Sequence, residues 1–370
     1  MKAFLLKSWI VGTDREQRYR IELLADSGVE LRWTDAADRK PWSLKPVRAV
    51  TRRLERLGAP FVQTLAAAPR LVRSDAVIAV FESQGNFLAG LRGLRLWPFT
   101  RPRLVVVACW LAMDAPKFSP GRLRAYRWMY RGVDRLVYFS PNQTEVYRDV
   151  LGIPEERLSF VPFGIDHEYF TPQDVDEEGY VLAVGRDKGR DWATLFDAVR
   201  GTDLDLRVVC RPEDVAGHDV PANVTVLGVV DRSTYRELTA KARAVVVATR
   251  PLAYPTGQSV TLESMAMGKA CVVSDTPAMA PYLRDGVDAV LVPPHDPEAL
   301  RAALHQVVDD PDLRKRVGAA ARDAVDHRFN APAMWREVAG LLHGHDQDGP
   351  GPDSGPGTGP DAGHDLGHGA

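Results

Sequence analysis

Three positive charges stand within five residues directly after a β-rich run in the second half of the chain. They are Arg186, Lys188 and Arg190, and Gly185 precedes them. Arginine can bind phosphate oxygens through two parallel hydrogen bonds, so a strand-to-helix turn with this composition suits a diphosphate. A solvent-exposed turn in which Arg190 pairs with Asp187 or Asp191 explains the same residues. The local sequence leaves both interpretations open.

A second anion site is predicted where a helical stretch begins further along the chain. Its first residues are Thr256, Gly257, Gln258 and Ser259. The first amides of a helix have no partner within the helix, and the helix dipole is positive at that end, so the site attracts phosphate. Gly257 carries no side chain and therefore lets a phosphate group come close to the backbone.

Glu263 lies near the middle of the same helical stretch, at the edge of an apolar face. Its carboxylate could accept two hydrogen bonds from a ribose diol, as acidic residues do in other nucleotide sites. The alternative is an ordinary exposed helix carboxylate. The apolar neighbours Leu262, Met265 and Ala266 favour burial and a functional role.

Several other α/β chemistries lack the motifs that they require. The run after the first predicted strand holds one glycine, Gly12, and no G-x-G-x-x-G fingerprint for a dinucleotide follows. The P-loop, H-E-x-x-H and G-x-S-x-G patterns are absent as well. The sequence therefore disfavours hydride transfer, nucleoside triphosphate hydrolysis, zinc proteolysis and α/β-hydrolase chemistry.

The candidate residues are carried by an alternation of short β-rich runs and amphipathic helical stretches. Strands are predicted at Lys2–Leu6, Val29–Trp33, Ala76–Phe81, Leu104–Cys109, Arg135–Phe139 and Leu158–Val161, and then at Tyr180–Val184, Leu206–Cys210, Val224–Leu227, Ala244–Ala248, Ala270–Ser274 and Ala289–Val292. Helices are predicted at Pro46–Leu57, Arg122–Tyr130, Gln143–Val150, Asp191–Arg200, Ser233–Ala242, Gln258–Met267 and Pro297–Val307. Strands of about five residues that alternate with helices of about ten indicate parallel sheets with right-handed crossovers.

Two such α/β units are predicted, separated by the polar stretch Thr171–Gly179. We expect one Rossmann-like domain in residues 1–172 and another in residues 173–343, facing each other across a cleft at their strand carboxyl ends. The last helical pattern, Pro332–Leu342, is expected to pack back across the interface. In residues 344–370, 13 of 27 residues are Gly or Pro, which predicts a disordered tail.

Composition places the chain among ordinary globular proteins. It has 370 residues, 45% of them hydrophobic and 26% charged, which excludes a disordered chain, a fibrous repeat and a small disulfide scaffold. The net charge of -2 divides into +9 for residues 1–172, -6 for residues 173–343 and -5 for residues 344–370. A basic first domain indicates an anionic partner, although a basic surface without a partner explains the same count.

The cysteines and the apolar runs indicate a cytoplasmic protein. Cys109, Cys210 and Cys271 are far apart and lack metal-ligand spacing, so buried free thiols in a reducing compartment are expected. Lys7 interrupts the apolar start, which argues against a signal peptide. The longest apolar run, Leu104–Met113, is far shorter than the ~20 residues that span a bilayer. We expect a cytoplasmic protein, with peripheral contact to the inner face of the membrane as a further expectation.

Several motifs in the second half resemble the GT-B-fold retaining glycosyltransferases of family 4, also called group 1. The resemblance is best over Leu158–Val292. The matching pieces are Val161-Pro162-Phe163-Gly164-Ile165-Asp166, Val184-Gly185-Arg186, Val226-Leu227-Gly228, the run Thr261–Ala270 with Glu263 within it, Ser274-Asp275, Asp285-Gly286 and Leu291-Val292-Pro293. Because these pieces occur in the family order, together they are more specific than any one of them.

The resemblance implies a role for each matched position. Arg186 and a second cation, Arg190 or Lys188, would hold the nucleotide diphosphate and stabilise it as the leaving group, and Glu263 would bind the ribose. The other implied donor contacts are Gly12, Gly185, the turn formed by Leu227, Gly228 and Val229 beside the base, and the run Thr256, Gly257, Gln258 and Ser259. The resemblance also implies that the leaving phosphate helps to deprotonate the acceptor. It implies no metal and no cofactor, because the cations and the helix dipole offset the developing charge.

The sequence departs from the family pattern at two places. The family usually has two glutamates eight positions apart, and the first would fall at Pro255, so Tyr254 and Gln258 are the nearest polar substitutes. The family often has a cleft histidine after a first-domain strand, whereas here Cys109-Trp110 follows the strand. Glu82, at the end of the preceding strand, is the acceptor-side candidate. An ordinary loop carboxylate is the alternative for Glu82.

The first domain, which the resemblance implies to be the acceptor side, carries basic and aromatic clusters. They comprise Lys45, Arg48 and Arg52; Leu94–Phe99 with Arg101 and Arg103; and Arg122, Arg124, Arg127 and Arg131 among Tyr126, Trp128 and Tyr130. Such surfaces suit docking on anionic lipid or binding of an anionic acceptor. A solvated basic face without a partner is the alternative. A nucleic-acid partner is not expected, because no nucleic-acid module is recognisable.

The sequence therefore predicts a hexosyltransferase. We expect it to move a hexose from a nucleotide-diphosphate sugar to a lipid-linked, glycan or small-molecule acceptor, with retention of configuration. Two alternatives share the fold, a non-catalytic nucleotide-sugar-binding protein and a sugar-nucleotide epimerase.

Overall fold

The computed structural model describes residues 1–6, 19–33 and 61–344. The predicted helix Pro46–Leu57, the donor contact Gly12 and nearly all of the predicted tail lie outside these residues.

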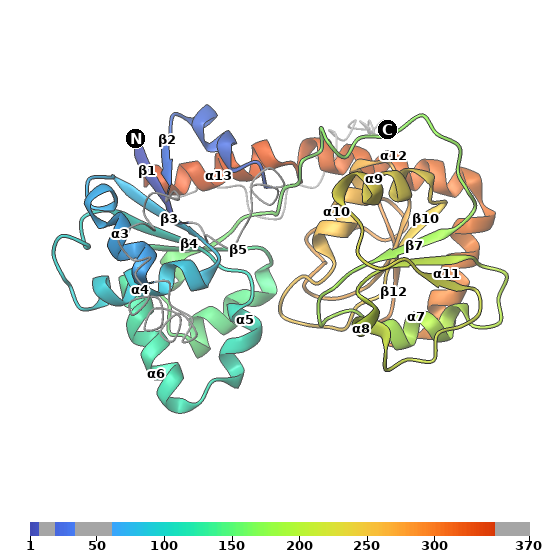
Figure 1. The fold of residues 1–370 in the computed structure, drawn as a ribbon, viewed down its shortest axis with the longest axis horizontal. Coiled ribbons are helices and arrows are strands. Elements are labelled where there is room, and N and C mark those ends of the chain that lie inside the picture. The colour runs from blue at the N-terminus through green and yellow to red at the C-terminus, as the bar shows by residue number, and fades with distance from the viewer. Residues whose placement is uncertain (7–18, 34–60, 345–370) are drawn as a thin grey trace, which may run out of the picture.

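Two six-stranded parallel sheets form the two lobes of the molecule (Figure 1). The first has the order β2-β1-β3-β4-β5-β6, with β1 (Lys2–Leu6), β2 (Glu30–Trp33), β3 (Ala76–Val80), β4 (Arg103–Val107), β5 (Arg135–Tyr138) and β6 (Leu158–Phe160). The second has the order β12-β11-β10-β7-β8-β9, with β7 (Val181–Val184), β8 (Leu206–Val209), β9 (Val224–Val226), β10 (Ala244–Val247), β11 (Cys271–Ser274) and β12 (Val290–Val292). Every predicted strand is present, and the prediction of two parallel α/β sheets is confirmed.

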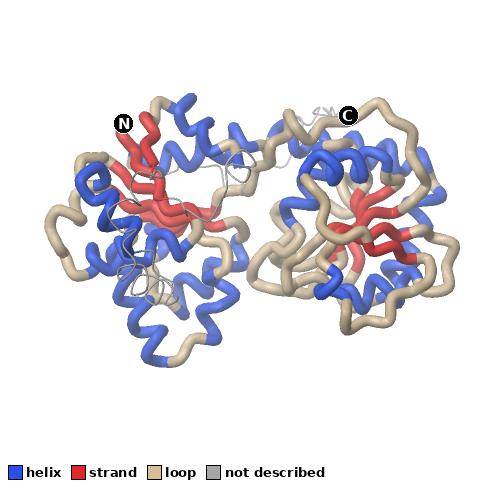
Figure 2. Tube along the Cα trace, viewed as in Figure 1, coloured by secondary structure: helices blue, strands red, loops and turns tan. Residues whose placement is uncertain are grey.

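Helices cover both faces of each sheet (Figure 2). They are α3 (Phe61–Leu71), α4 (Glu82–Gly93), α5 (Leu111–Asp114), α6 (Pro120–Met129), α7 (Trp192–Val199), α8 (Pro212–Val215), α9 (Arg232–Lys241), α10 (Gln258–Ala266), α11 (Pro297–Asp309), α12 (Pro311–His327) and α13 (Ala331–His343). Shorter 3-10 turns include η1 (Ile21–Ser27), η4 (Tyr130–Gly132) and η5 (Pro141–Gln143). On the second sheet, α9, α10 and α12 lie on one side and α7, α8 and α11 on the other.

One helical prediction needs correction, and some helices were not predicted. The stretch Gln143–Val150 is not one α-helix, because η5 and the π-helical turn η6 (Val146–Val150) divide it. The sequence analysis also missed α3, α4 and α12. The run that forms α4 contains Gly85, which makes it look like a loop. In the fold, a Cβ at Gly85 would lie 2.9 Å from Val106 of β4, so glycine lets α4 pack closely on the sheet.

Side chains alternate between the two faces of the first sheet, as the pleat of a strand requires. Phe4 and Leu6 point into a core formed with α3 and α4. Ala3 and Leu5 point to the opposite face, where the core continues into η1 and α13. One face of the first sheet is thus covered by a helix from the far end of the described chain.

Within the described residues the chain crosses between the lobes twice, and the two crossings are joined by hydrogen bonds. Ile165 donates its amide to Phe329 at 3.0 Å, and Ala331 donates to Ile165 at 2.8 Å. Gly164 lies directly against the Asn330 carbonyl, where a side chain would overlap the backbone. The second crossing leads into α13, which corresponds to the predicted helix Pro332–Leu342 and packs on η1 and β4.

None of the helices within the described ranges is long and apolar enough to cross a bilayer. The three cysteines are free, and Cys210 and Cys271 are buried. Burial raises the pKa of the Cys210 thiol to about 11, which keeps it protonated near neutral pH.

Candidate active site

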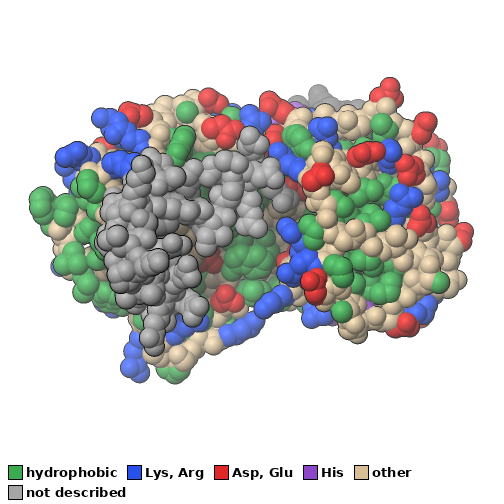
Figure 3. Space-filling model, viewed as in Figure 1, with side chains coloured by type: hydrophobic (Ala, Val, Ile, Leu, Met, Phe, Trp, Pro, Cys, Tyr) green, Lys and Arg blue, Asp and Glu red, His purple; other side chains and the backbone are tan. Residues whose placement is uncertain are grey.

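A cleft of ≈ 800 Å³ lies at the carboxyl ends of the second sheet. The first lobe contributes Trp110, Met113 and Asp114 to its wall. The second lobe contributes residues that follow β7, β8 and β9, together with the first residues of α10. Figure 3 shows Lys and Arg side chains along the edge of the second lobe that faces the first. Open parallel sheets bind ligands at this edge, so the cleft is the candidate active site.

The three cations of the turn after β7 differ in exposure and in their ion pairs. Arg186 and Lys188 are exposed and line the cleft, and neither forms a hydrogen bond or ion pair with a described residue. Arg190 also lines the cleft, but it is buried and its Nε lies 3.3 Å from Asp187 Oδ2. The predicted pairing with Asp187 therefore occurs at Arg190, while Arg186 and Lys188 keep the charge that an anion can reach.

Two glycines make room for the buried Arg190 side chain. A methyl group at Gly185 would overlap the Arg190 guanidinium. At Gly257 a Cβ would overlap the Val247 side chain and would lie 2.8 Å from Arg190 Nη1. Gly257 also has φ 84°, a conformation that favours glycine. The buried arginine thus joins the turn after β7 to the start of α10.

The start of α10, where the sequence predicts an anion site, lies at the wall of the cleft. Gly257, Gln258, Ser259 and Val260 line the wall, and the N-cap residue Gly257 has no side chain that could cap the helix. Thr256 is 3% exposed and packs against Gly189, so its side chain faces the interior rather than the cleft. The amide end of α10 and the free cations after β7 therefore share one cavity.

Glu263 lies further along α10, and its side chain is 1% exposed. This rules out the alternative of an exposed helix carboxylate. Glu263 is not among the residues that line the cleft. Its contact with a ribose remains a prediction.

The turn after β9 reaches the cleft at one of its three predicted positions. Val229 is 56% exposed and lines the wall, whereas Leu227 and Gly228 do not. Gly228 has φ 76° and turns the chain toward Val229. A contact of this turn with the nucleobase remains a prediction.

Glu82 has a structural role that the sequence did not reveal. Its carboxylate accepts hydrogen bonds from the amides of Cys109 at 3.0 Å and Trp110 at 2.8 Å. Burial raises the pKa of Glu82, and the amide hydrogen bonds act against this shift. Glu82 begins α4, so it is not a loop carboxylate, and it does not line the cleft. Contact with an acceptor remains a prediction.

Several residues that line the cleft were missed by the sequence analysis. They are Trp110, Met113, Asp114, Arg211, Asp231, Arg232 and Tyr235. Arg211 and Arg232 each follow a strand that the sequence predicted correctly, so their position after a strand was the available signal. The Trp110 ring packs on Tyr254 with 4.4 Å between ring centroids, and this contact joins the two lobes beside the cleft. Tyr254, one of the proposed substitutes for the missing glutamate, therefore lies at the cleft wall.

Comparison with known proteins identifies relatives of the second lobe. Residues 181–310 match the family described as "Glycosyl transferases group 1". A phosphatidyl-myo-inositol mannosyltransferase of Mycolicibacterium smegmatis is 34% identical over 204 residues, or 49% of this chain and 50% of the relative. An MMP alpha-(1->4)-mannosyltransferase of Mycolicibacterium hassiacum is 25% identical over 255 residues, or 65% of this chain and 61% of the relative. The chain spans about half the length of several curated relatives that it matches.

Solved structures share the arrangement of the two lobes. A sucrose-phosphate synthase of Thermosynechococcus elongatus aligns with a TM-score of 0.70 and 17% identity, over 93% of this chain and 98% of that one. HepE of Anabaena in complex with UDP-glucose aligns with a TM-score of 0.67 and 15% identity, over 93% and 99%. The fold is the predicted GT-B arrangement of two facing Rossmann-like domains.

Proposed function

We propose that this protein is a hexosyltransferase that uses a nucleotide-diphosphate sugar as donor and transfers the sugar with retention of configuration. One observation carries the proposal: Arg186 and Lys188 lie without a partner among the described residues, in the same cleft as the start of α10. Cations and a helix N-terminus together form a site for a diphosphate. The glycosyltransferase match over residues 181–310 supports this assignment.

The proposed chemistry follows from where charge develops. As the sugar–phosphate bond breaks, negative charge grows on the leaving diphosphate. Arg186, Lys188 and the amide end of α10 are then the groups that stabilise it, without a metal ion. In a retaining transfer, a leaving phosphate oxygen on the same face takes the proton of the acceptor hydroxyl. Trp110 and Asp114 line the cleft from the first lobe, and we propose that the acceptor binds on that side.

The first test is a screen for donors followed by a turnover assay. We expect UDP- or GDP-sugars to raise the unfolding temperature, and the product to retain the anomeric configuration of the donor by NMR. Arg186→Gln should weaken nucleotide diphosphate binding about tenfold or more, since a hydrogen bond to a charged group contributes roughly 1.5–3 kcal/mol. Adding EDTA should leave the rate unchanged.

Arg200→Gln is the matched control, because Arg200 is a partly exposed arginine of the same lobe that does not line the cleft. It should bind nucleotides like the wild type. Failure of every nucleotide sugar to stabilise the protein would overturn the proposed function.

The two alternatives differ from the proposal in what they do with donor and acceptor. An epimerase changes the sugar nucleotide without an acceptor, so incubation with donor alone separates it from a transferase. A non-catalytic protein binds the donor but transfers no sugar in any assay. If the protein is a transferase, Glu263→Ala should abolish its turnover.

We further propose that the first lobe contacts an anionic membrane surface through a basic–aromatic rim, defined here as the loop after α4 and the adjacent α6. In the loop, Trp97 is 83% exposed and Leu94 is 57% exposed. The exposed cations of the rim are Arg95, Arg101, Arg122, Arg124 and Arg127. Exposed aromatic and basic side chains together favour an anionic lipid interface.

Vesicle sedimentation tests this contact. The wild type should bind vesicles that contain phosphatidylglycerol and should not bind phosphatidylcholine alone, and Trp97→Ser should reduce the bound fraction. Equal binding of wild type and Trp97→Ser would refute the rim as the contact.

A further inference from the structure

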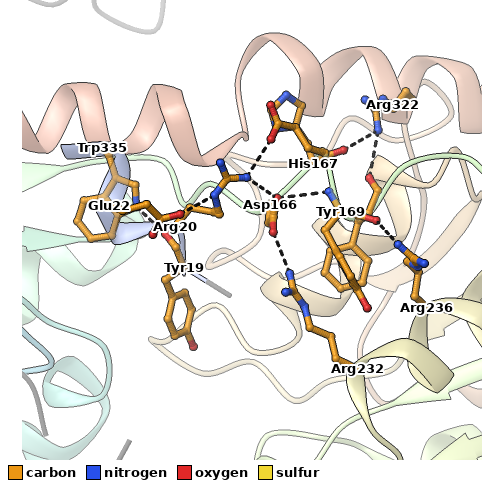
Figure 4. Close-up of polar contacts among 12 residues, drawn as sticks. Tyr19, Arg20, Glu22, Asp166, His167, Tyr169, Arg232, Arg236, Arg322 and Trp335 are labelled. Atoms are coloured by element: carbon orange, nitrogen blue, oxygen red, sulfur yellow. Dashed lines mark hydrogen bonds and ion pairs between the residues drawn. The ribbon is translucent and has the colours of Figure 1, made fainter. Parts of the chain in front are cut away.

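Arg232 is a cation of the cleft to which the proposed function assigns no role. It is the first residue of α9, and it lines the cleft together with Asp231 and Val229. Its Nη2 lies 3.0 Å from Asp166 Oδ2, and its guanidinium lies 3.8 Å from the centroid of the Tyr169 ring (Figure 4). The guanidinium is therefore held both at its edge and on one face.

Asp166 holds Arg232 in place from the segment between the two sheets. The Asp166 carboxylate is buried and uses separate oxygens for two arginines: Oδ2 for Arg232, and Oδ1 for Arg20 of the first lobe at 3.0 Å. Figure 4 shows the two guanidinium groups on different sides of Asp166. Asp166 also accepts the Tyr169 amide at 3.3 Å, which fixes the aromatic platform below Arg232.

Two further arginines hold the Tyr169 ring and the neighbouring backbone in place. Arg236 lies 4.4 Å from the centroid of the Tyr169 ring and donates to the Tyr169 carbonyl at 3.3 Å. Arg322 of α12 donates to the carbonyls of His167 and Phe170. A side chain held by a rigid surrounding shell loses little freedom when it binds a ligand, so Arg232 is preorganised.

The sheet order separates Arg232 from the diphosphate cations. Arg186 follows β7, whereas Arg232 follows β9 at the edge of the sheet, two strands away. Neighbouring strands are spaced by ~4.8 Å, so the two strand ends lie roughly 10 Å apart. Arg232 lies six residues beyond β9, at the start of α9, and lines the same cleft as Arg186. With the diphosphate at Arg186 and the start of α10, we assign Arg232 to the nucleoside half of the donor.

The free donors of Arg232 suit a carbonyl oxygen on a nucleobase. A guanidinium has five N–H groups. Nη2 donates to Asp166, and Nη1 forms no hydrogen bond with a described residue, so Nη1 is the donor that a ligand in the cleft can use. Arginine recognises the O6 edge of guanine, and the O4 of uracil is a similar acceptor, whereas adenine presents an amino group at the corresponding position.

We propose that Arg232 is a specificity-determining contact to the nucleobase of the donor, that it favours uracil or guanine over adenine, and that Asp166 is its positioning residue. This inference rests on the proposed function, because it needs a nucleotide diphosphate in the cleft.

Calorimetric titration with UDP, GDP, ADP and inorganic pyrophosphate tests the contact. The wild type should bind UDP or GDP more tightly than ADP. Arg232→Gln should weaken the preferred nucleotide about tenfold and leave pyrophosphate unchanged, so the preference over ADP disappears. Arg232→Lys, which keeps the charge but not the planar fork, should lose the same preference.

A double-mutant cycle tests the positioning role of Asp166. Asp166→Asn should weaken the preferred nucleotide, and it should have no further effect in the Arg232→Gln background, because it acts through Arg232. Glu22→Gln is the control, since Glu22 also binds Arg20 but is 60% exposed and has no ion pair with Arg232. It should bind as the wild type does.

The outcomes separate this inference from the proposed function. The inference is overturned if Arg232→Gln binds the nucleotides like the wild type, or if it weakens pyrophosphate and nucleotide equally. Full additivity of the two substitutions overturns the positioning role of Asp166. A wild type that binds neither nucleotide nor pyrophosphate overturns the proposed function, and the inference fails with it.

Discussion

Arg190 differs from the two neighbouring cations of the cleft in its burial and its partner. Three neighbouring cations suggested one phosphate site, yet Arg190 is buried and paired with Asp187, while Arg186 and Lys188 face the cavity. All three cations line the same cleft, and their binding of a phosphate stays a prediction. The sequence could not predict which one turns inward, because that depends on the space left by Gly185 and Gly257 in three dimensions.

Gly185→Ala tests this arrangement. The added methyl would displace the Arg190 guanidinium, so we expect the free energy of unfolding to fall by about 1–3 kcal/mol and nucleotide diphosphate binding to weaken. Urea unfolding and titration measure the two effects. Gly121→Ala in α6 is the control, because nothing lies near its added Cβ, and it should change stability by less than about 1 kcal/mol. Equal free energies of unfolding for Gly185→Ala and Gly121→Ala would show that the Arg190 side chain can move away from the added methyl group without loss of stability.

At the scale of elements, strands were more predictable than helices. The β-branched runs of the central strands β10 and β11 are buried on both faces, and such continuous apolar runs are distinct in the sequence. The start of α4 was less visible. Phe81 has φ 74° directly before it, and Glu82 contacts residues 27 and 28 positions away, which no local pattern encodes.

Glu82→Gln tests the tie between α4 and the segment after β4. Cys109 and Trp110 donate to different oxygens of Glu82, and a glutamine has an NH₂ group in place of one of these oxygens, so it cannot keep both hydrogen bonds in this geometry. We expect a loss of about 1–3 kcal/mol in the free energy of unfolding. The exposed carboxylate Glu145 provides the control, and Glu145→Gln should stay within about 0.5 kcal/mol of the wild type. An unchanged free energy of unfolding in Glu82→Gln would show that these two hydrogen bonds contribute little to stability.

At the scale of the whole molecule, the two lobes are joined by contacts between segments far apart in sequence. The Tyr282 hydroxyl accepts the Phe163 amide and donates to the Phe139 carbonyl. Asp166 links arginines of both lobes, and α13 returns from the second lobe to cover the first sheet. The division of the chain at residues 172 and 173 remains a prediction, because α13 contributes to the core of the first lobe.

Trp335→Ala tests the return of α13. Trp335 is 3% exposed and donates its indole N–H to the Tyr19 carbonyl at 2.6 Å. Loss of a buried tryptophan side chain should lower the free energy of unfolding by roughly 3–5 kcal/mol. Arg336→Ala on the exposed side of α13 should have little effect. A small loss in Trp335→Ala would mean that α13 contributes little to the first lobe.

The central claim is that a nucleotide diphosphate binds between the turn after β7 and the start of α10. A crystal structure of the protein with a bound nucleotide diphosphate tests it most directly. The account predicts the diphosphate within hydrogen-bond distance of Arg186 or Lys188 and of the backbone at Gly257–Ser259. A nucleotide bound outside this cleft, or a cleft that remains empty at saturating nucleotide, would contradict it.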